Sequence, residues 1–275
     1  MSQPITDRPA YTFRRGTAPL LISMPHVGTY VPPAIAERFT DEARQVHDTD
    51  WHLEQLYDFV DEIGASLLVA THSRYVVDMN RPPDGASLYP GQSVTGLCPV
   101  DTFDDTPVYR DPSLVPDEAE IAARREAVWR PYHDTLGAEL ERLRAEHGVA
   151  VLWDAHSIRS VLPRFFEGKL PDLNLGTGKG VSCDPAMAEA VFAQAQAATG
   201  YTSVLNGRFT GGHITRNYGN PARNIHAIQL EMTQSSYMQE VLPFDYLPEV
   251  AAGIQPHLRR MVQAALDFAL KQAAR

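Results

Sequence analysis

Residues 149–153 (VAVLW) form a run that is apolar at every position. A strand with this pattern is covered on both faces, as in a parallel sheet that lies between layers of helices. Other short strand-like segments occur at 19–24, 66–71, 75–79, 202–205 and 225–232. The chain is therefore expected to build a sheet whose central strands are buried.

Helix-like segments separate these runs, because apolar residues recur there at spacings of three and four. They are expected at 41–63, at 117–147 with a break before Pro131, from about 184, and from about 246 onward. Alternating strands and helices indicate an α/β domain with a mostly parallel or mixed sheet. Since no linker-like segment interrupts the chain, residues 1–275 are expected to form one domain.

Two segments, 82–115 and 171–182, read as long loops rich in glycine, proline or aspartate. A loop as long as 82–115 often covers a functional site, although it can also be a plain surface excursion. Residues 176–180 (GTGKG) lack the spacing of a phosphate-binding loop, so nucleotide binding is not expected. A serine nucleophile is not expected either, because no G-x-S-x-G motif occurs.

The amino-acid composition excludes several classes of binding partner. The net charge of −10 argues against a nucleic-acid-binding or anionic-membrane surface. No segment reaches the roughly 20 apolar residues that a membrane span needs. The two cysteines, Cys98 and Cys183, suggest neither a disulfide scaffold nor a zinc ribbon, and no histidine lies near them. A soluble, cytoplasmic protein that acts on a small molecule is expected.

Ligands of open α/β sheets bind beyond the carboxyl ends of the strands. Three polar groups follow apolar runs at such ends: His26, the DAHS segment at 154–157, and Glu231. The acidic segment 47–51 (HDTDW) follows the first loop. These positions are the leading candidates for chemistry.

Two histidines and one carboxylate form a catalytic zinc site that leaves a position for water. His26, Asp50 and His156 are candidates for that set, and Glu231 is a candidate general base. Asp154 either orients an imidazole or caps a turn. The spacings of 24 and 106 residues between the three candidates match no compact metal motif, and each residue also has an ordinary structural reading.

Several arginines lie in or beside loops: Arg74, Arg81 next to Asn80, and Arg216. A guanidinium group matches a carboxylate with two parallel hydrogen bonds, so these side chains suit a small dicarboxylate substrate. Routine ion pairing with the surplus acidic residues is the alternative. His213 lies beside two glycines, which permit close approach to a ligand.

Five segments occur in a fixed order: SMPHVG (23–28), DTDW (48–51), DMNRPP (78–83), DAHS (154–157) and LEMT (230–233). Together they resemble the N-formylglutamate amidohydrolase family. The resemblance implies a three-layer αβα fold similar to zinc carboxypeptidases and aspartoacylases. It also implies metal-dependent hydrolysis of N-formyl-L-glutamate to glutamate and formate, a step of histidine degradation. One divalent metal ion, expected to be Zn²⁺, would be held by His26, Asp50 and His156.

By the same resemblance Glu231 would be the general base, Asn80 and Arg81 would grip a substrate carboxylate, and Arg216 would be a second contact. The chain departs from the H-x-x-E spacing of the carboxypeptidases, because residue 29 is threonine. Asp48 is therefore a rival of Asp50 as the acidic ligand. A different N-acyl amino acid substrate and a dicarboxylate-binding protein without a metal remain alternatives.

Overall fold

The computed structural model describes residues 5–86 and 94–274, and its centre is a seven-stranded sheet of order β1-β3-β2-β4-β7-β5-β6. The strands are β1 (Tyr11–Arg14), β2 (Leu20–Met24), β3 (Ser66–Ala70), β4 (Ala150–Ile158), β5 (Leu173–Gly176), β6 (Ser203–Leu205) and β7 (Ile225–Thr233). Four neighbouring pairs are parallel, whereas β1 with β3 and β5 with β7 are antiparallel. The predicted α/β class with a mixed, mostly parallel sheet is confirmed.

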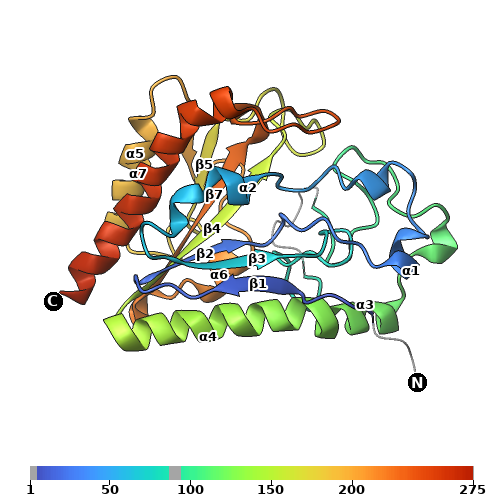
Figure 1. Cartoon of the computed structure of the whole chain (residues 1–275), viewed down its shortest axis with the longest axis horizontal. Helices are drawn as coiled ribbons and strands as arrows, with labels where there is room; N and C mark the ends of the chain where they lie inside the picture. The colour runs from blue at the N-terminus through green and yellow to red at the C-terminus, as the bar shows by residue number, and fades with distance from the viewer. Residues whose placement is uncertain (1–4, 87–93, 275) are drawn as a thin grey trace.

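Helices cover both faces of the sheet (Figure 1). They are α1 (Pro33–Ala36), α2 (Leu53–Leu56), α3 (Glu118–Arg124), α4 (Arg130–His147), α5 (Pro185–Gln196), α6 (His213–Tyr218) and α7 (Pro248–Ala273). Val151 and Trp153 of β4 pack in the core under α5 and α7, whereas Ala150 and Leu152 pack in the core under α4. Because successive side chains of a strand point to opposite faces, one buried strand serves both cores.

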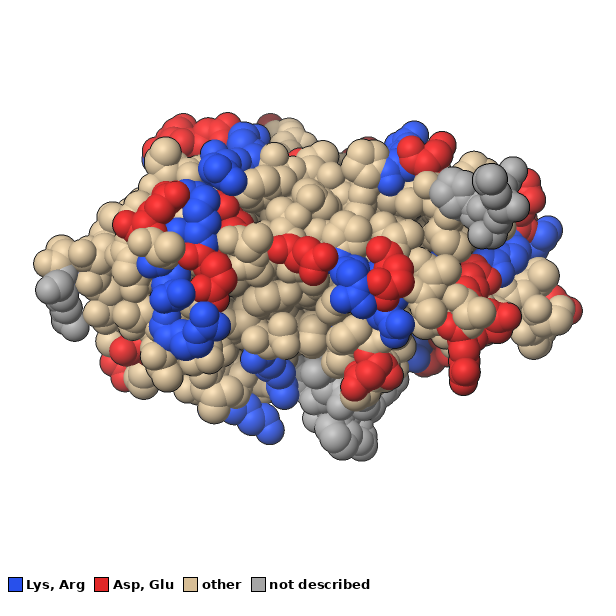
Figure 2. Space-filling view, turned by 90° about the horizontal axis from the view of Figure 1, so that it is seen from below, with Lys and Arg blue, Asp and Glu red and all other residues tan. Residues whose placement is uncertain are grey.

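The outer face of α4 carries both signs of charge. Figure 2 views the molecule from the side on which α4 lies in Figure 1 and shows acidic and basic side chains interspersed there. Pairs such as Arg142 with Glu146 and Arg144 with Glu141 account for part of this pattern. No helix in the described residues is long and apolar enough to cross a membrane.

The helix expected at 41–63 is wrong. Only α2 and two short 3₁₀ turns, Ala43–Gln45 and Asp58–Val60, form there. Val46 and His52 adopt left-handed backbone angles, which a helix interior does not accept. The helix-like spacing of apolar residues arises because Leu53, Leu56, Phe59 and Val60 all pack on the core, although they lie in separate short turns.

Two strand predictions also need correction. Residues 75–79 pair with no strand of the described sheet. They lie in turns, from which Tyr75 and Val76 pack in one apolar cluster and Val77 and Met79 in another. Conversely, β5 lies inside 171–182, which was expected to be a loop throughout. The predicted break before Pro131 is confirmed as a π-helical turn, Arg125–Trp129.

The strands that matter for the site are neighbours in the middle of the sheet. β2, β4 and β7 are parallel and adjacent, so their carboxyl ends meet at one edge. His156 of β4 lies opposite Glu231 of β7 in the register. After β2 the chain passes close to the end of β3, and a Cβ atom on Gly28 would lie 2.3 Å from the carbonyl oxygen of His72. Glycine at 28 thus permits the turn that follows His26.

We expect Gly28→Ala to lower the free energy of unfolding by about 1–3 kcal/mol, because the added methyl group meets backbone that cannot move aside. Gly96→Ala is the matched control, since no described atom lies within 4 Å of its Cβ position. Urea unfolding of both variants measures the difference. Equal stability of the two variants would contradict the close approach at Gly28.

Candidate functional site

Three side chains from different elements come together at the carboxyl edge of the sheet. His26 follows β2, Asp50 lies before α2, and His156 lies within β4, and all three are buried. Oδ2 of Asp50 is 3.8 Å from Nδ1 of His26 and 3.1 Å from Nδ1 of His156. One donor atom from each residue lies within 4.8 Å of the other two, which suggests a metal site.

The second nitrogen of each imidazole has its own partner. Nε2 of His26 lies 2.7 Å from Oδ1 of Asp78, and Nε2 of His156 lies 3.1 Å from Oδ1 of Asp154. Metal-binding histidines in proteins commonly donate their other N–H to a carboxylate, which fixes the ring and its tautomer, and Asp78 is placed to accept this bond from His26. Nε2 of His156 also lies 3.0 Å from Nδ2 of Asn80. This arrangement leaves both Nδ1 atoms facing Asp50. The donor set therefore fits a divalent ion of the zinc type.

The electrostatics of the cluster also fit a cation. Burial, together with Arg74, lowers the pKa of His26, which keeps this ring neutral. Burial opposes charge on His156 as well, but the carboxylates of Asp154 and Asp50 outweigh it and hold the pKa of His156 well above its ordinary value. Burial raises the pKa of Glu231. A positive charge at the cluster would oppose that rise by favouring the carboxylate.

Asp48 has a separate role. Its Oδ2 atom accepts hydrogen bonds from the Tyr75 hydroxyl at 2.6 Å and from the Phe103 backbone N–H at 2.8 Å. Arg159 lies 3.7 Å from its other oxygen. Among the described residues the donor cluster contains Asp50 and not Asp48, so the geometry favours Asp50 as the acidic member. Through its bond to Phe103, Asp48 instead holds the loop around that residue close to this end of the sheet.

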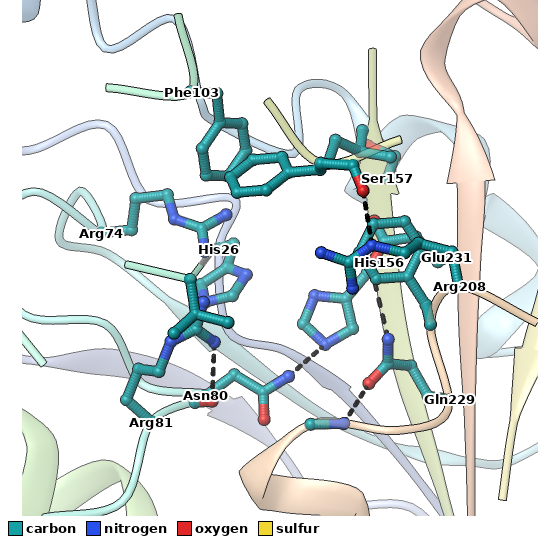
Figure 3. Close-up of a pocket in the computed structure, with 15 residues that line it drawn as sticks. His26, Arg74, Asn80, Arg81, Phe103, His156, Ser157, Arg208, Gln229 and Glu231 are labelled. Carbon is teal, nitrogen blue, oxygen red and sulfur yellow. Dashed lines mark hydrogen bonds between the residues drawn. The ribbon is translucent and has the colours of Figure 1, made fainter. Parts of the chain in front are cut away.

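A pocket opens onto the cluster. Its described lining comprises His26, Arg74, Asn80, Arg81, Val94, Phe103, His156, Ser157, Ile158, Phe165, Arg208, Phe209, Gly212, Gln229 and Glu231. Figure 3 shows Arg74 and Arg81 on one side of this pocket and Arg208 with Glu231 on the other. The pocket thus combines a metal-type donor set, one further carboxylate and three arginines.

The arginines are held by their neighbours. Arg74 donates to Asp78 at 2.7 Å and stacks on Phe103, and Arg81 donates to the carbonyl and hydroxyl oxygens of Thr95. Nε of Arg208 donates to the carbonyl oxygen of Phe165 at 2.6 Å. Fixed guanidinium groups lose less freedom when they bind a carboxylate.

Two predicted substrate contacts lie outside this lining. Arg216 donates to the carbonyl oxygen of Gly211 and the hydroxyl of Thr210, and His213 packs near Trp129 and His133. Neither side chain is among the described residues that line the pocket. They instead flank the Gly211–Gly212 turn, of which Gly212 borders the pocket. Their role as substrate contacts stays a prediction.

Sequence reasoning missed three residues of this site: Asp78, Arg208 and Gln229. Asp78 stands in the DMNRPP segment that carried the resemblance, and Arg208 lies in a loop like the arginines that were selected. Gln229 precedes Glu231 by two positions, so it shares a face of β7 with it. The signals for these residues were present but were weak without the sheet order.

Asp50→Asn removes a charged donor from the cluster, so we expect affinity for Zn²⁺ to fall at least about 100-fold. Asp48→Asn is the matched control, because an amide oxygen still accepts from Tyr75 and Phe103 and leaves the cluster intact. Titration against a zinc-chelating dye measures both variants. A larger loss for Asp48→Asn than for Asp50→Asn would reverse the assignment.

Comparison with known proteins confirms the resemblance. The family model for N-formylglutamate amidohydrolase matches residues 18–238. N-formylglutamate deformylases of Pseudomonas putida and Pseudomonas aeruginosa are each 50% identical to this chain, covering 96% of it and 98% of the relative. The crystal structure of N-formylglutamate amidohydrolase from Ralstonia eutropha JMP134 matches with a TM-score of 0.78 at 25% identity, covering 94% of this chain and 97% of that one.

A solved structure from Agrobacterium tumefaciens shares the fold, with a TM-score of 0.70 at 21% identity over 95% of this chain and 96% of that one. The family match spans β2 to β7 and includes every member of the donor cluster and the candidate base. The two Pseudomonas relatives extend the similarity over nearly the whole length. The chain therefore belongs to the N-formylglutamate amidohydrolase family.

Proposed function

We propose that this protein hydrolyses N-formyl-L-glutamate to L-glutamate and formate. One observation carries the proposal beyond family membership: the cluster of His26, Asp50 and His156 shares one pocket with Glu231 and three arginines. Hydrolysis of an amide needs an activated water and a group that moves protons, and a dicarboxylate substrate needs cationic partners. The Pseudomonas relatives are named for this activity.

We propose that His26, Asp50 and His156 hold one divalent ion, most simply Zn²⁺. When bound, such an ion acts as a Lewis acid and brings the pKa of water toward neutrality. Asp78 keeps the ring of His26 turned so that Nδ1 faces Asp50, and Asn80 contacts Nε2 of His156 on the side of the ring away from Asp50. The same donor set also accepts Co²⁺ or Mn²⁺, so metal analysis of the purified protein identifies the bound ion.

Glu231 is the group we assign to proton transfer. Its carboxylate takes a proton from the water whose oxygen bonds to the formyl carbon. When the carbon–nitrogen bond breaks, Glu231 returns that proton to the departing amine nitrogen, so formate and glutamate leave with protons balanced. Burial raises the pKa of Glu231, which suits a group that must both accept and release a proton near neutral pH.

The arginines would bind the two carboxylates of the substrate. We assign the α-carboxylate of the substrate to Asn80 and Arg81, with Arg74 beside them. We assign the side-chain carboxylate to Arg208 on the opposite wall (Figure 3). Arg216 and His213 would support the substrate through the Gly211–Gly212 turn that they flank. Carboxylates bound on opposite walls would hold the formyl group between them, near the donor cluster.

The direct test is formate release from N-formyl-L-glutamate by the purified protein and by Glu231→Gln. We expect turnover by the variant to fall about 10²-fold or more while metal content and KM change little, because glutamine keeps the shape but cannot exchange the proton. N-acetyl-L-glutamate is the control substrate. Near-wild-type turnover by Glu231→Gln would remove Glu231 from this role, and a preference for the acetyl compound would change the assigned substrate.

Arg208→Ala should separate substrates by side-chain charge. We expect kcat/KM for N-formyl-L-glutamate to fall about 10- to 100-fold, the range of a charge-assisted hydrogen bond, and that for N-formyl-L-glutamine to change much less. Arg81→Ala should lower kcat/KM for both, since both compounds keep the α-carboxylate. Arg223→Ala, which removes an exposed partner of Glu141, is the control. Equal losses on both substrates for Arg208→Ala would refute this division of labour.

A further inference from the structure

The side chain of Gln229 joins the candidate base to the start of α6. It is 3% exposed and lines the pocket two residues before Glu231 on β7. Its Nε2 atom donates to Oε2 of Glu231 at 3.3 Å, and its Oε1 atom accepts the backbone N–H of Gly212 at 2.7 Å. Figure 3 shows both hydrogen bonds in line across the pocket wall.

We propose that Gln229 is a positioning residue that, anchored by the first turn of α6, holds Glu231 in the orientation needed for proton transfer. This inference rests on the proposed function. The backbone N–H of Gly212 can only donate, so it must face the amide oxygen of Gln229. The NH₂ end of the amide is thereby directed at Glu231.

Asn80 shows the same arrangement with Ile214, two residues after Gly212. Its Oδ1 atom accepts the backbone N–H of Ile214 at 2.8 Å, which turns Nδ2 toward Nε2 of His156 at 3.0 Å. Two backbone N–H groups at the start of α6 therefore fix two side-chain amides. One amide faces the candidate base, and the other faces a candidate metal ligand.

Glycine at 212 is what allows this contact. A Cβ atom there would lie 2.3 Å from Nδ2 and 2.5 Å from Oδ1 of Asn80. The amide of Asn80 would have to move, and the backbone of α6 would retreat from both amides. The start of α6 is thus shaped to bring its backbone against the pocket wall, which supports an aligning role over a purely space-filling one.

The test is Gln229→Met, which keeps the length of the side chain and removes its donor and acceptor. We expect kcat for N-formyl-L-glutamate to fall about 10- to 100-fold with KM and bound metal within about threefold of wild type. Gln255→Met, on α7, removes a hydrogen bond to the carbonyl oxygen of Leu56 away from the pocket and is the matched control. Its kcat should equal that of wild type.

A double-mutant cycle separates positioning from a general structural effect. If Gln229 acts through Glu231, adding Gln229→Met to Glu231→Gln should cost less than about twofold in the remaining kcat. A loss of the same size in both backgrounds would overturn the proposal. Gln229→Asn, whose amide is one methylene too short to reach both partners, should reproduce the fall in kcat and serves if Gln229→Met does not fold.

The outcome is distinct from a failure of the proposed function. If the wild-type protein releases no formate from N-formyl-L-glutamate, the assigned substrate is wrong. If the wild type is active and both Gln229 variants keep its kcat, the substrate stands and the positioning role of Gln229 is refuted.

Discussion

The parallel pairing of β4 with β7 is the constraint on which the site depends. In this register His156 lies opposite Glu231, and Asp154 lies opposite Gln229, all on one face of the sheet. The intervening residues, such as Ala155, pack in the apolar core on the other face. A slip of one residue would exchange the two faces and place the ionisable groups in the core under α5 and α7. Packing of that core therefore also sets the geometry of the chemistry.

Several carboxylates buried close together favour a cation at this site. Four carboxylates of the site are buried near one another: Asp50, Asp78, Asp154 and Glu231. The positive charge of Arg74, which pairs with Asp78, compensates only part of their negative charge. A buried charge without a partner is expensive, and a divalent ion among these oxygens would offset that cost. Raised proton affinity at His156 and Glu231 is what such a cluster shows without the ion's charge.

Sequence reasoning identified His26, His156 and Glu231 because chemistry at strand ends is a local signal. It placed the end of one strand too early: β4 runs on to Ile158, so His156 lies inside the strand, where it lines the pocket. The strand predicted at 225–232 matches β7 and already contained Glu231. The choice between Asp48 and Asp50 depends on the backbone between Val46 and His52, both of which adopt left-handed angles. The spacing of apolar residues cannot predict such turns. Arg208 was missed because its approach to the pocket depends on where β6 joins the sheet edge.

The neutral amides of Asn80 and Gln229 solve a problem that a charged side chain would worsen. A lysine or arginine in contact with Glu231 would favour the carboxylate strongly and weaken it as a base, whereas another carboxylate would favour the protonated form. An amide donates a hydrogen bond without adding a net charge, so it fixes orientation and shifts the proton affinity of Glu231 less than a cation in contact would. Because an amide can flip, its oxygen needs an anchor, and the backbone N–H groups of Gly212 and Ile214 provide one for each. The two amides are therefore oriented by α6, whereas the side chains that they face, His156 and Glu231, come from the sheet.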